Sequence, residues 1–405
     1  MILRITPILL LLLILPAWVI YRMHFKNSKT WKKILLLAPN AILCLLTIYY
    51  ALHDNVINKN AEAIAIFLII VFAITIPEAM FSVVCGCFRL SSNRNIRKMG
   101  LITGFVVAVL FDFLVFSSVI SCFKPPLVTK HCFISNDLPE AFDGYKIVHL
   151  SDLHVGTFKL YPQAMRNIVR KINAEKADLI AFTGDLVNFD SDEIRYFRKE
   201  LSEFKAKDGV VSVMGNHDYL MYIDFKNDSA NIGHIKNLQT EQKNAGWHLL
   251  LNENIPIHRG NDSIYIIGSE NDGEKPFPSR GNLNAAQKGL PKSCFKVLLT
   301  HDPSQWRKKV LPLTDIQLTL SGHTHAGQIK LLGHSVSEIK YKEWNGMYYE
   351  GNRALQISSG VGEALVPFRL GAWPNIDVVV LKRKIDRKCE YCIMCISYAW
   401  LYRFL

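Results

Sequence analysis

The chain has 405 residues, half of them hydrophobic, and a formal net charge of +12 at pH 7. Residues 1–123 carry +7 of this charge, so the remainder of the chain is nearly balanced at +5. A nearly balanced second part argues against the basic groove of a polyanion-binding protein, and we expect no nucleic-acid partner.

Four apolar segments, each long enough to cross a bilayer, make up the first third of the chain. They are residues 5–22, 34–52, 62–85 and 101–121. The first lacks a strongly charged start and a small-residue cleavage site, which favours a retained span over a signal peptide. Residues 1–123 are therefore predicted to form a four-helix transmembrane bundle. Within it, Glu78 is expected to face a neighbouring helix rather than to line an ion pathway.

The loops between the spans predict the orientation of this bundle. The first and third links are rich in Lys and Arg, whereas Lys59 is the one such residue in the second link. The basic residues of the two links are Arg22, Lys26, Lys29, Lys32, Lys33, Arg89, Arg94, Arg97 and Lys98. Because Lys and Arg favour the cytoplasmic side, the rest of the chain is expected on the non-cytoplasmic side. The same charges favour contact with anionic membrane lipids.

Residues 124–143, which include Pro125-Pro126, are predicted to be a short linker to a soluble domain. In that domain the buried-strand patterns are YKIVHLS, LIAFT, VVSVM, FKVLLT, IQLTLS and IDVVVLK. Helices are predicted near 161–175, 191–206 and 234–245, and hairpins pair 255–258 with 263–268 and 347–350 with 354–358. This alternation predicts a two-sheet α/β sandwich, with long polar loops near 219–233 and 269–292 at the substrate mouth.

A polar cluster follows each of five of these strands. The clusters are Asp152-Leu153-His154, Gly184-Asp185, Gly215-Asn216-His217-Asp218, His301 and Gly322-His323-Thr324-His325. Each cluster alone is compatible with an ordinary turn or a structural histidine. The complete ordered set indicates instead that oxygen and imidazole donors meet at the carboxyl ends of the strands, where α/β folds build their sites.

These residue types are those that a pair of divalent cations requires. Asp185 is the best candidate for a carboxylate lying between the two ions, since the preceding Gly184 permits a sharp turn. Asp152 and His154 are expected to share one cation, and His323 and His325 to contribute one imidazole to each. Neutral ligands from Asn216 and His301 would complete the second site. His217 is predicted to be the proton donor, and Asp218 is predicted to orient its ring.

The same pattern resembles that of the calcineurin-like metallophosphoesterases over about residues 144–382. The resemblance implies an αββα sandwich with a dinuclear centre of Mn, Fe, Zn or Mg. It implies hydroxide attack on phosphorus, with His217 as general acid. It assigns one metal to Asp152, His154, Asp185 and His325, and the other to Asp185, Asn216, His301 and His323.

A narrower resemblance links GHTHAGQIKLLG and ISSGVGEALVPFRLGAWPNI to the membrane-anchored YkuE- and YaeI-like branch of that family. Ala326 and Trp373-Pro374-Asn375 depart from the branch pattern beside the ligands, which affects substrate preference. The resemblance makes Arg369 a candidate phosphate contact, because a guanidinium matches phosphoryl oxygens. The alternative is a surface arginine after a proline turn.

Residues 383–405 form an apolar tail containing Cys389, Cys392 and Cys395, which lacks the second ligand pair of a zinc site. The tail is expected to lie on the membrane interface or to pack on the domain.

The predicted activity is metal-dependent hydrolysis of a phosphodiester or phosphomonoester that is membrane-proximal or lipid-linked. One alternative is a pyrophosphate hydrolase acting on UDP-diacylglucosamine in lipid A synthesis. That substrate is made on the cytoplasmic side, which conflicts with the predicted orientation. Alternatives from other classes are a transporter and a non-catalytic membrane sensor or binding module. A complete ligand set argues against the latter.

Overall fold

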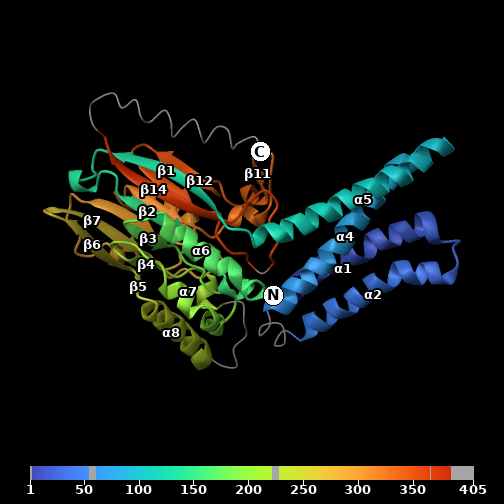
Figure 1. Ribbon diagram of the computed structural model, residues 1–405, viewed down its shortest axis with the longest axis horizontal. Helices are drawn as coiled ribbons and strands as arrows, with labels where there is room; N and C mark the ends of the chain where they lie inside the picture. The colour runs from blue at the N-terminus through green and yellow to red at the C-terminus, as the bar shows by residue number, and fades with distance from the viewer. Residues whose placement is uncertain (1, 54–60, 221–227, 365, 385–405) are drawn as a thin grey trace. The chain divides into compact units, whose positions relative to one another are not determined.

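The computed structural model describes residues 2–53, 61–220, 228–364 and 366–384 (Figure 1). It divides into two compact units, Met1–Ser121 with Leu365–Phe368, and Cys122–Ala364 with Arg369–Leu405. The predicted tail, residues 383–405, lies almost entirely outside the described residues, as does much of the predicted 219–233 loop.

The first unit contains four long apolar helices among the described residues, as predicted. They are α1 (Ile2–Ile20), α2 (Thr30–Leu52), α4 (Ala61–Arg89) and α5 (Arg94–Cys122). Each is long and apolar enough to cross a membrane. Helices α4 and α5 run past the apolar segments, because the helical backbone continues into their charged ends at Arg89 and Arg94.

Contacts within this unit follow the rules of packing in lipid. Glycines on α5 let α4 approach closely: a Cβ built at Gly104 would lie 2.9 Å from Cys85 Sγ, and one at Gly100 would overlap Phe88. Glu78 accepts hydrogen bonds from Asn40 Nδ2 at 3.1 and 3.2 Å, so its carboxylate faces α2. This pairing gives the Glu78 carboxylate a donor from a neighbouring helix and agrees with the expected helix-facing role of Glu78.

The second unit is built on two six-stranded sheets. The first has the order β1-β14-β2-β3-β4-β5, with the bounds Leu127–Ser135, Asn375–Arg383, Lys146–Leu150, Leu179–Phe182, Val210–Ser212 and Trp247–Leu249. The second has the order β12-β13-β9-β8-β7-β6, with the bounds Gly346–Glu350, Arg353–Ile357, Leu318–Ser321, Phe295–Leu299, Asp262–Gly268 and Glu253–Arg259. Strands β2–β5 are mutually parallel, as are β7, β8, β9 and β13. Parallel strands bring their carboxyl ends to one edge of each sheet.

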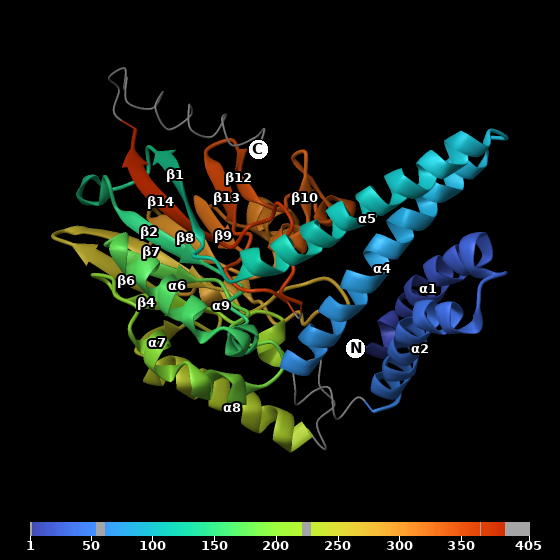
Figure 2. The ribbon, with the colours of Figure 1, turned by 45° about the vertical axis from the view of Figure 1, so that its right-hand side comes forward.

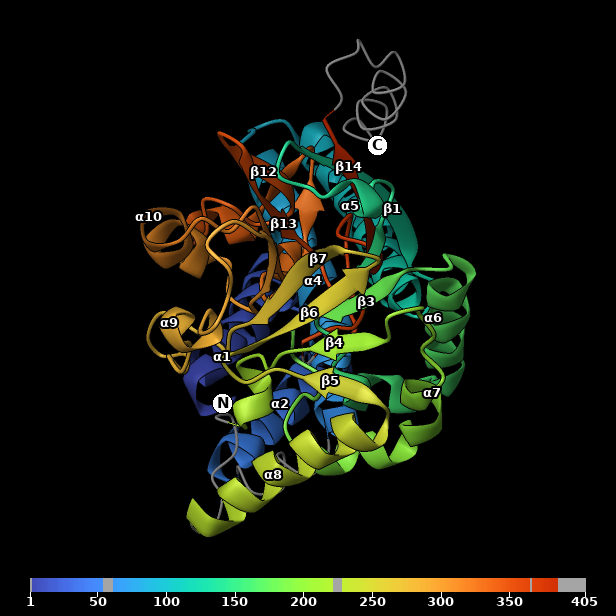
Figure 3. The same ribbon diagram turned by 90° about the vertical axis from the view of Figure 1, so that its left-hand side faces the viewer.

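Helices cover the outer faces of the two sheets (Figure 3). The first sheet packs against α6 (Pro162–Ala174), α7 (Arg198–Ser202) and α8 (Asp228–Asn244). The short α9 (Leu283–Ala286), together with the segment of Trp306 and Val310 that leads into α10 (Leu311–Leu313), covers the second sheet. A separate apolar cluster, including Ile147, Val211, Ile266 and Val297, fills the space between the sheets. The predicted αββα sandwich is confirmed.

Two local predictions need correction. The predicted linker 124–143 contains β1, which pairs in parallel with β14 along the edge of the first sheet. Pro125-Pro126 suggested a linker, but the strand begins after them at Leu127. An edge strand also tolerates polar residues such as Thr129, Lys130 and His131, because one side of it faces solvent. The predicted helix 191–206 is a 3-10 segment, Ser191–Tyr196, followed by the short α7. Helix α6 and both predicted hairpins are present.

Candidate metal centre

The five polar clusters lie at the carboxyl ends of parallel strands from both sheets. Asp152 follows β2, Asp185 follows β3, and Asn216 follows β4 in the first sheet. His301 follows β8 and His323 follows β9 in the second sheet. The site is therefore built where the edges of the two sheets meet, and the stacked sheets hold ligands from distant parts of the sequence together.

The backbone at this edge is strained. Asp152, His154, Asp185, His323 and His325 all have positive φ angles, between 44° and 73°. Residues other than glycine rarely adopt this region, and each such residue costs of order 1–3 kcal/mol. Five of the seven predicted metal ligands share this conformation. The surrounding fold thus holds the donors in place against local preference, as is typical of functional sites.

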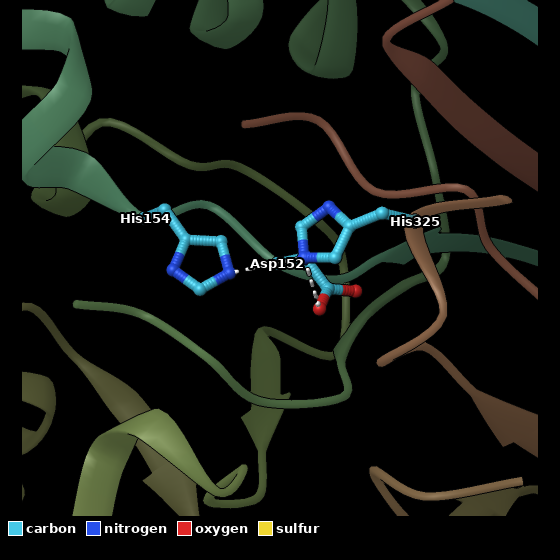
Figure 4. A group of neighbouring side chains, drawn as sticks. All are labelled: Asp152, His154 and His325. Carbon is cyan, nitrogen blue, oxygen red and sulfur yellow. Dashed lines mark hydrogen bonds and ion pairs between the residues drawn. The ribbon is translucent and has the colours of Figure 1, made fainter. Parts of the chain in front are cut away.

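One group of donors comprises Asp152, His154 and His325 (Figure 4). His325 Nε2 lies 3.2 Å from Asp152 Oδ1 and 3.1 Å from His154 Nε2. All three side chains are buried. Their nitrogen and oxygen atoms converge on one small volume, which is the arrangement that a single cation would occupy.

A second group comprises Asp185, His301 and His323, and Asp185 also belongs to a third group with His154 and His217. Asp185 Oδ2 lies 3.0 Å from His301 Nε2 and 3.7 Å from His154 Nε2. Asp185 is therefore shared between the second and third groups, and the third group shares His154 with the first. Asn216 is buried beside them, next to His217, whose backbone N–H donates to Asp185 Oδ1 at 2.8 Å.

The orientation of the histidines fits a metal site. His154 Nδ1 lies 3.2 Å from Val187 O, and His301 Nδ1 lies 2.8 Å from Thr183 O. A carbonyl can only accept, so each Nδ1 carries a proton. His154 Nε2 then presents its lone pair to the site, and His301 Nε2 can do so once its own proton is displaced. This contact with a backbone carbonyl is the usual way in which a ligand imidazole is held in the correct tautomer.

The protonation states also suit metal binding. Burial lowers the pKa of His154, and burial lowers that of His323 to about 4, so both rings are neutral. Burial opposes ionisation of Asp152 and Asp185, but the adjacent histidines, His325 and His301 foremost, hold both carboxyl pKa values below their usual range. Burial also opposes protonation of His301, yet Asp185 raises the pKa of this ring to about 10. A cation binding here would displace that proton.

His217 is partly buried, as His323 is. Its Nδ1 lies 2.7 Å from Asn188 O, which fixes the ring, and its ring packs edge-on against His154 with centroids 4.7 Å apart. Burial lowers the pKa of His217, while Asp185 opposes this effect. A partly exposed imidazole beside the donors is positioned to exchange a proton with a bound substrate.

Asp218, predicted to orient the His217 ring, has a different set of contacts. Its carboxylate accepts the backbone N–H groups of Asp185 and Leu186 at 2.8 Å and of Gly215 at 2.9 Å. Burial, together with the charge of Asp185, raises its pKa to about 7. Asp218 ties the Asp185 loop to the Asn216 loop, and the backbone of Asn188 supplies the contact that orients His217.

Arg369 is completely buried, which excludes the alternative of a surface arginine. Its guanidinium donates to Ser359 O at 3.0 Å, Ala372 O at 2.8 Å and Gly362 O at 2.5 Å, and Nε pairs with Glu363 Oε1 at 3.3 Å. Nη2 also lies 3.3 Å from His325 Nδ1. These contacts favour a role in positioning the His325 loop, and the predicted contact with phosphate remains a prediction.

Two aromatic residues at the site were missed by sequence reasoning. The hydroxyl of Tyr341 lies 2.7 Å from His323 Nε2, and the ring of Phe277 meets the His323 ring edge-on with centroids 4.8 Å apart. Phe277 comes from the 269–292 loop that was predicted to shape the substrate mouth. No motif identifies either residue, because each reaches His323 only through the folding of a loop.

Comparison with known proteins identifies a matching family model and several relatives. The family model described as calcineurin-like phosphoesterase matches residues 145–327. The uncharacterized metallophosphoesterase YkuE of Bacillus subtilis (strain 168) is 30% identical over 263 residues, covering 63% of this chain and 85% of the relative. An uncharacterized metallophosphoesterase of Aquifex aeolicus (strain VF5) is 25% identical over 260 residues, covering 64% of this chain and 92% of the relative. A Bos taurus transmembrane protein with a metallophosphoesterase domain is 28% identical over 270 residues, covering 64% of this chain and 58% of the relative.

Proposed function

Because the chain belongs to the calcineurin-like phosphoesterase family, we propose that it is an integral-membrane, metal-dependent hydrolase of a phosphodiester or phosphomonoester. The observation that carries the proposal is the position of Asp185. One buried carboxylate faces His301 from one donor group and His154 from another. A carboxylate placed in this way can offset the repulsion between two cations held a few ångströms apart.

In the proposed site, one cation is held by Asp152, His154, Asp185 and His325, and the other by Asp185, Asn216, His301 and His323. Two divalent ions of the Mn, Fe, Zn or Mg class would supply Lewis-acid stabilisation and hydroxide chemistry near neutral pH. The buried protein donors exclude bulk water and fix the substrate position. His217, in its imidazolium form, donates a proton from Nε2 to the leaving oxygen while Nδ1 remains bonded to Asn188 O. An approaching anionic phosphoester favours the protonated ring.

The decisive experiment uses the full chain, purified and reconstituted in nanodiscs, stripped of metal and reloaded with one metal at a time. We expect hydrolysis of bis-p-nitrophenyl phosphate that depends on metal. Asp185→Ala should reduce the activity to background and lower the bound metal. The exposed acid Asp192 provides the matched control, and Asp192→Ala should behave as wild type. Full activity and metal content in Asp185→Ala would refute the bridging role. Bound metal without hydrolysis of any aryl monoester or diester would favour the binding-module alternative.

We further propose that the catalytic unit lies on the non-cytoplasmic side and acts on a membrane-proximal or lipid-linked ester. The basic first and third loops support this orientation. A reporter that is active only outside the cytoplasm, fused after Leu405, should give a signal, and a cytoplasm-only reporter should not. The reverse result would overturn the orientation and would revive the cytoplasmic UDP-diacylglucosamine alternative.

A further inference from the structure

Residues 330–342, which we call the β10–β11 segment, expose an unusual amount of apolar surface. Leu332 is 100% exposed and Ile339 is 90% exposed, and Leu331 and Val336 are also exposed. Single exposed apolar residues are ordinary, but four large ones within nine positions form a patch of the kind that marks an interaction surface. Figure 2 shows the hairpin of β10 (Lys330–Leu331) and β11 (His334–Ser335) standing out beside β12.

The hairpin holds these side chains outward. Lys330 pairs with Ser335 and Leu331 with His334, so the turn consists of Leu332 and Gly333, with φ angles of 51° and 87°. Such a turn suits Asn-Gly or Gly-Gly, and a leucine at positive φ is unfavourable. Full exposure of that leucine brings no compensating burial within the chain. The positive φ of Leu332 and its full exposure are both explained if the side chain inserts into a binding partner outside the chain.

The charge around the patch indicates what that partner is. Lys330, Lys340 and Lys342 flank the apolar residues. The acid in the segment, Glu338, is engaged locally by His334 at 3.1 Å and by the backbone N–H of Ser335. Apolar side chains bordered by lysines complement a lipid surface with anionic head groups, into which the apolar tips insert. The same chain carries four helices that are long and apolar enough to cross a membrane.

Two parts of the segment contact residues in or next to the metal centre. Ser335 Oγ donates to the carbonyl of Ala326, the residue after His325, at 2.6 Å. Tyr341 bonds His323, and Lys340 Nζ lies 4.5 Å from the centre of the Phe277 ring that packs on His323. A surface that received Leu332 and Ile339 would therefore bring its head groups to the side of the site lined by Lys340.

We propose that the β10–β11 segment docks on the anionic lipid surface, with Leu331, Leu332, Val336 and Ile339 in the acyl boundary. The metal centre then receives a phosphoester carried by a lipid head group, with Lys340 contacting its anionic oxygens. The docking itself is independent of catalysis. Only the assignment of the substrate class rests on the proposed function.

Hydrogen exchange measured by mass spectrometry on the full chain tests the docking. Peptides covering 330–342 should exchange more slowly in nanodiscs containing anionic lipid than in zwitterionic nanodiscs or detergent micelles. The double variant Leu332→Glu/Ile339→Glu should abolish this protection. The control is Leu313→Glu, at an apolar residue that is 71% exposed on α10, and it should retain the protection. Equal exchange in all three environments would overturn the proposal. Protection that rises with protein concentration would also overturn it, by assigning the patch to a second copy of the chain.

Kinetics test the substrate class separately. The rate at which the double variant hydrolyses soluble bis-p-nitrophenyl phosphate should stay within about twofold of the wild-type rate. For a fluorogenic phosphodiester embedded in the nanodisc, the double variant should need about tenfold more substrate than wild type to reach the same rate. Equal losses on both substrates would refute the docking role. If wild type hydrolyses neither substrate, the proposed function fails, whereas the exchange experiment still decides the docking.

Discussion

The hydroxyl of Tyr341 lies 2.7 Å from Nε2 of His323, while Nδ1 of the same ring lies 3.3 Å from His301 Nε2. A neutral imidazole has one N–H. If Nε2 donates to the tyrosine oxygen, Nδ1 presents its lone pair to the metal centre. His323 therefore turns the opposite nitrogen, Nδ1, toward His301, and a tyrosine hydroxyl rather than a backbone carbonyl bonds its other nitrogen.

Tyr341→Phe should consequently weaken metal binding about 10–100-fold, the usual effect of losing a group that orients a ligand histidine. The measurement is metal content and activity during titration of stripped protein. Tyr349→Phe is the matched control, because the Tyr349 hydroxyl donates to Cys132 O instead of a ligand. Unchanged metal affinity in Tyr341→Phe would remove this residue from the site.

His217→Ala should retain bound metal but slow turnover by roughly 10²–10⁴-fold, the scale of general-acid loss. The loss should be largest for esters with alkyl leaving groups and smallest for p-nitrophenyl esters, since p-nitrophenolate leaves without protonation. A plot of rate against leaving-group pKa checks this. An identical loss across the whole leaving-group series would contradict the acid role.

Asp218→Asn should destabilise the fold around the site. The amide retains one acceptor oxygen, whereas the carboxylate receives three short backbone hydrogen bonds through both oxygens. Each buried N–H left without an acceptor costs about 1–3 kcal/mol. A lower thermal midpoint and weaker metal binding are expected in nanodiscs, with Asp192→Asn as the control. A variant with wild-type stability would show that the two loops do not depend on this carboxylate.

Arg369→Lys keeps the positive charge but loses the planar donor fork. If Arg369 positions the His325 loop, thermal stability and kcat should fall while KM changes little. Glu363→Gln, which weakens the buried ion pair without touching His325 directly, should produce a milder form of the same effect. A large rise in KM at unchanged stability would instead support the predicted contact with phosphate.

Much of the architecture could be predicted from local patterns in the sequence. The four long apolar helices, the two-sheet α/β domain and the family resemblance are confirmed by the fold and by the comparisons. Strand β1 was missed because an edge strand lacks the continuous apolar pattern of a buried one. The helix predicted over 191–206 breaks at Phe197, whose φ and ψ of −129° and 15° are not helical.

The order and chemical type of the donor residues could likewise be predicted from the sequence, because each motif is a few residues long and follows a recognisable strand. The structure brings together Asp152, His154, Asp185, His217, His301, His323 and His325 in overlapping groups. Their individual roles remain predictions. The contacts of Asp218 and Arg369 differ from the expected ones because each is set by distant backbone groups rather than by neighbours in sequence.

The sequence by itself determined the chemical identity of the candidate donors and the length and apolar character of the four N-terminal helices, since both depend on short-range composition and spacing. Only the tertiary structure decided that Tyr341 supports His323, that carbonyls of Thr183, Val187 and Asn188 orient three imidazoles, and that Leu332 is held outward. Each of these depends on how separate loops meet at the sheet edges. The positions of these loops depend on packing between residues far apart in the chain, and no local sequence pattern predicts such packing.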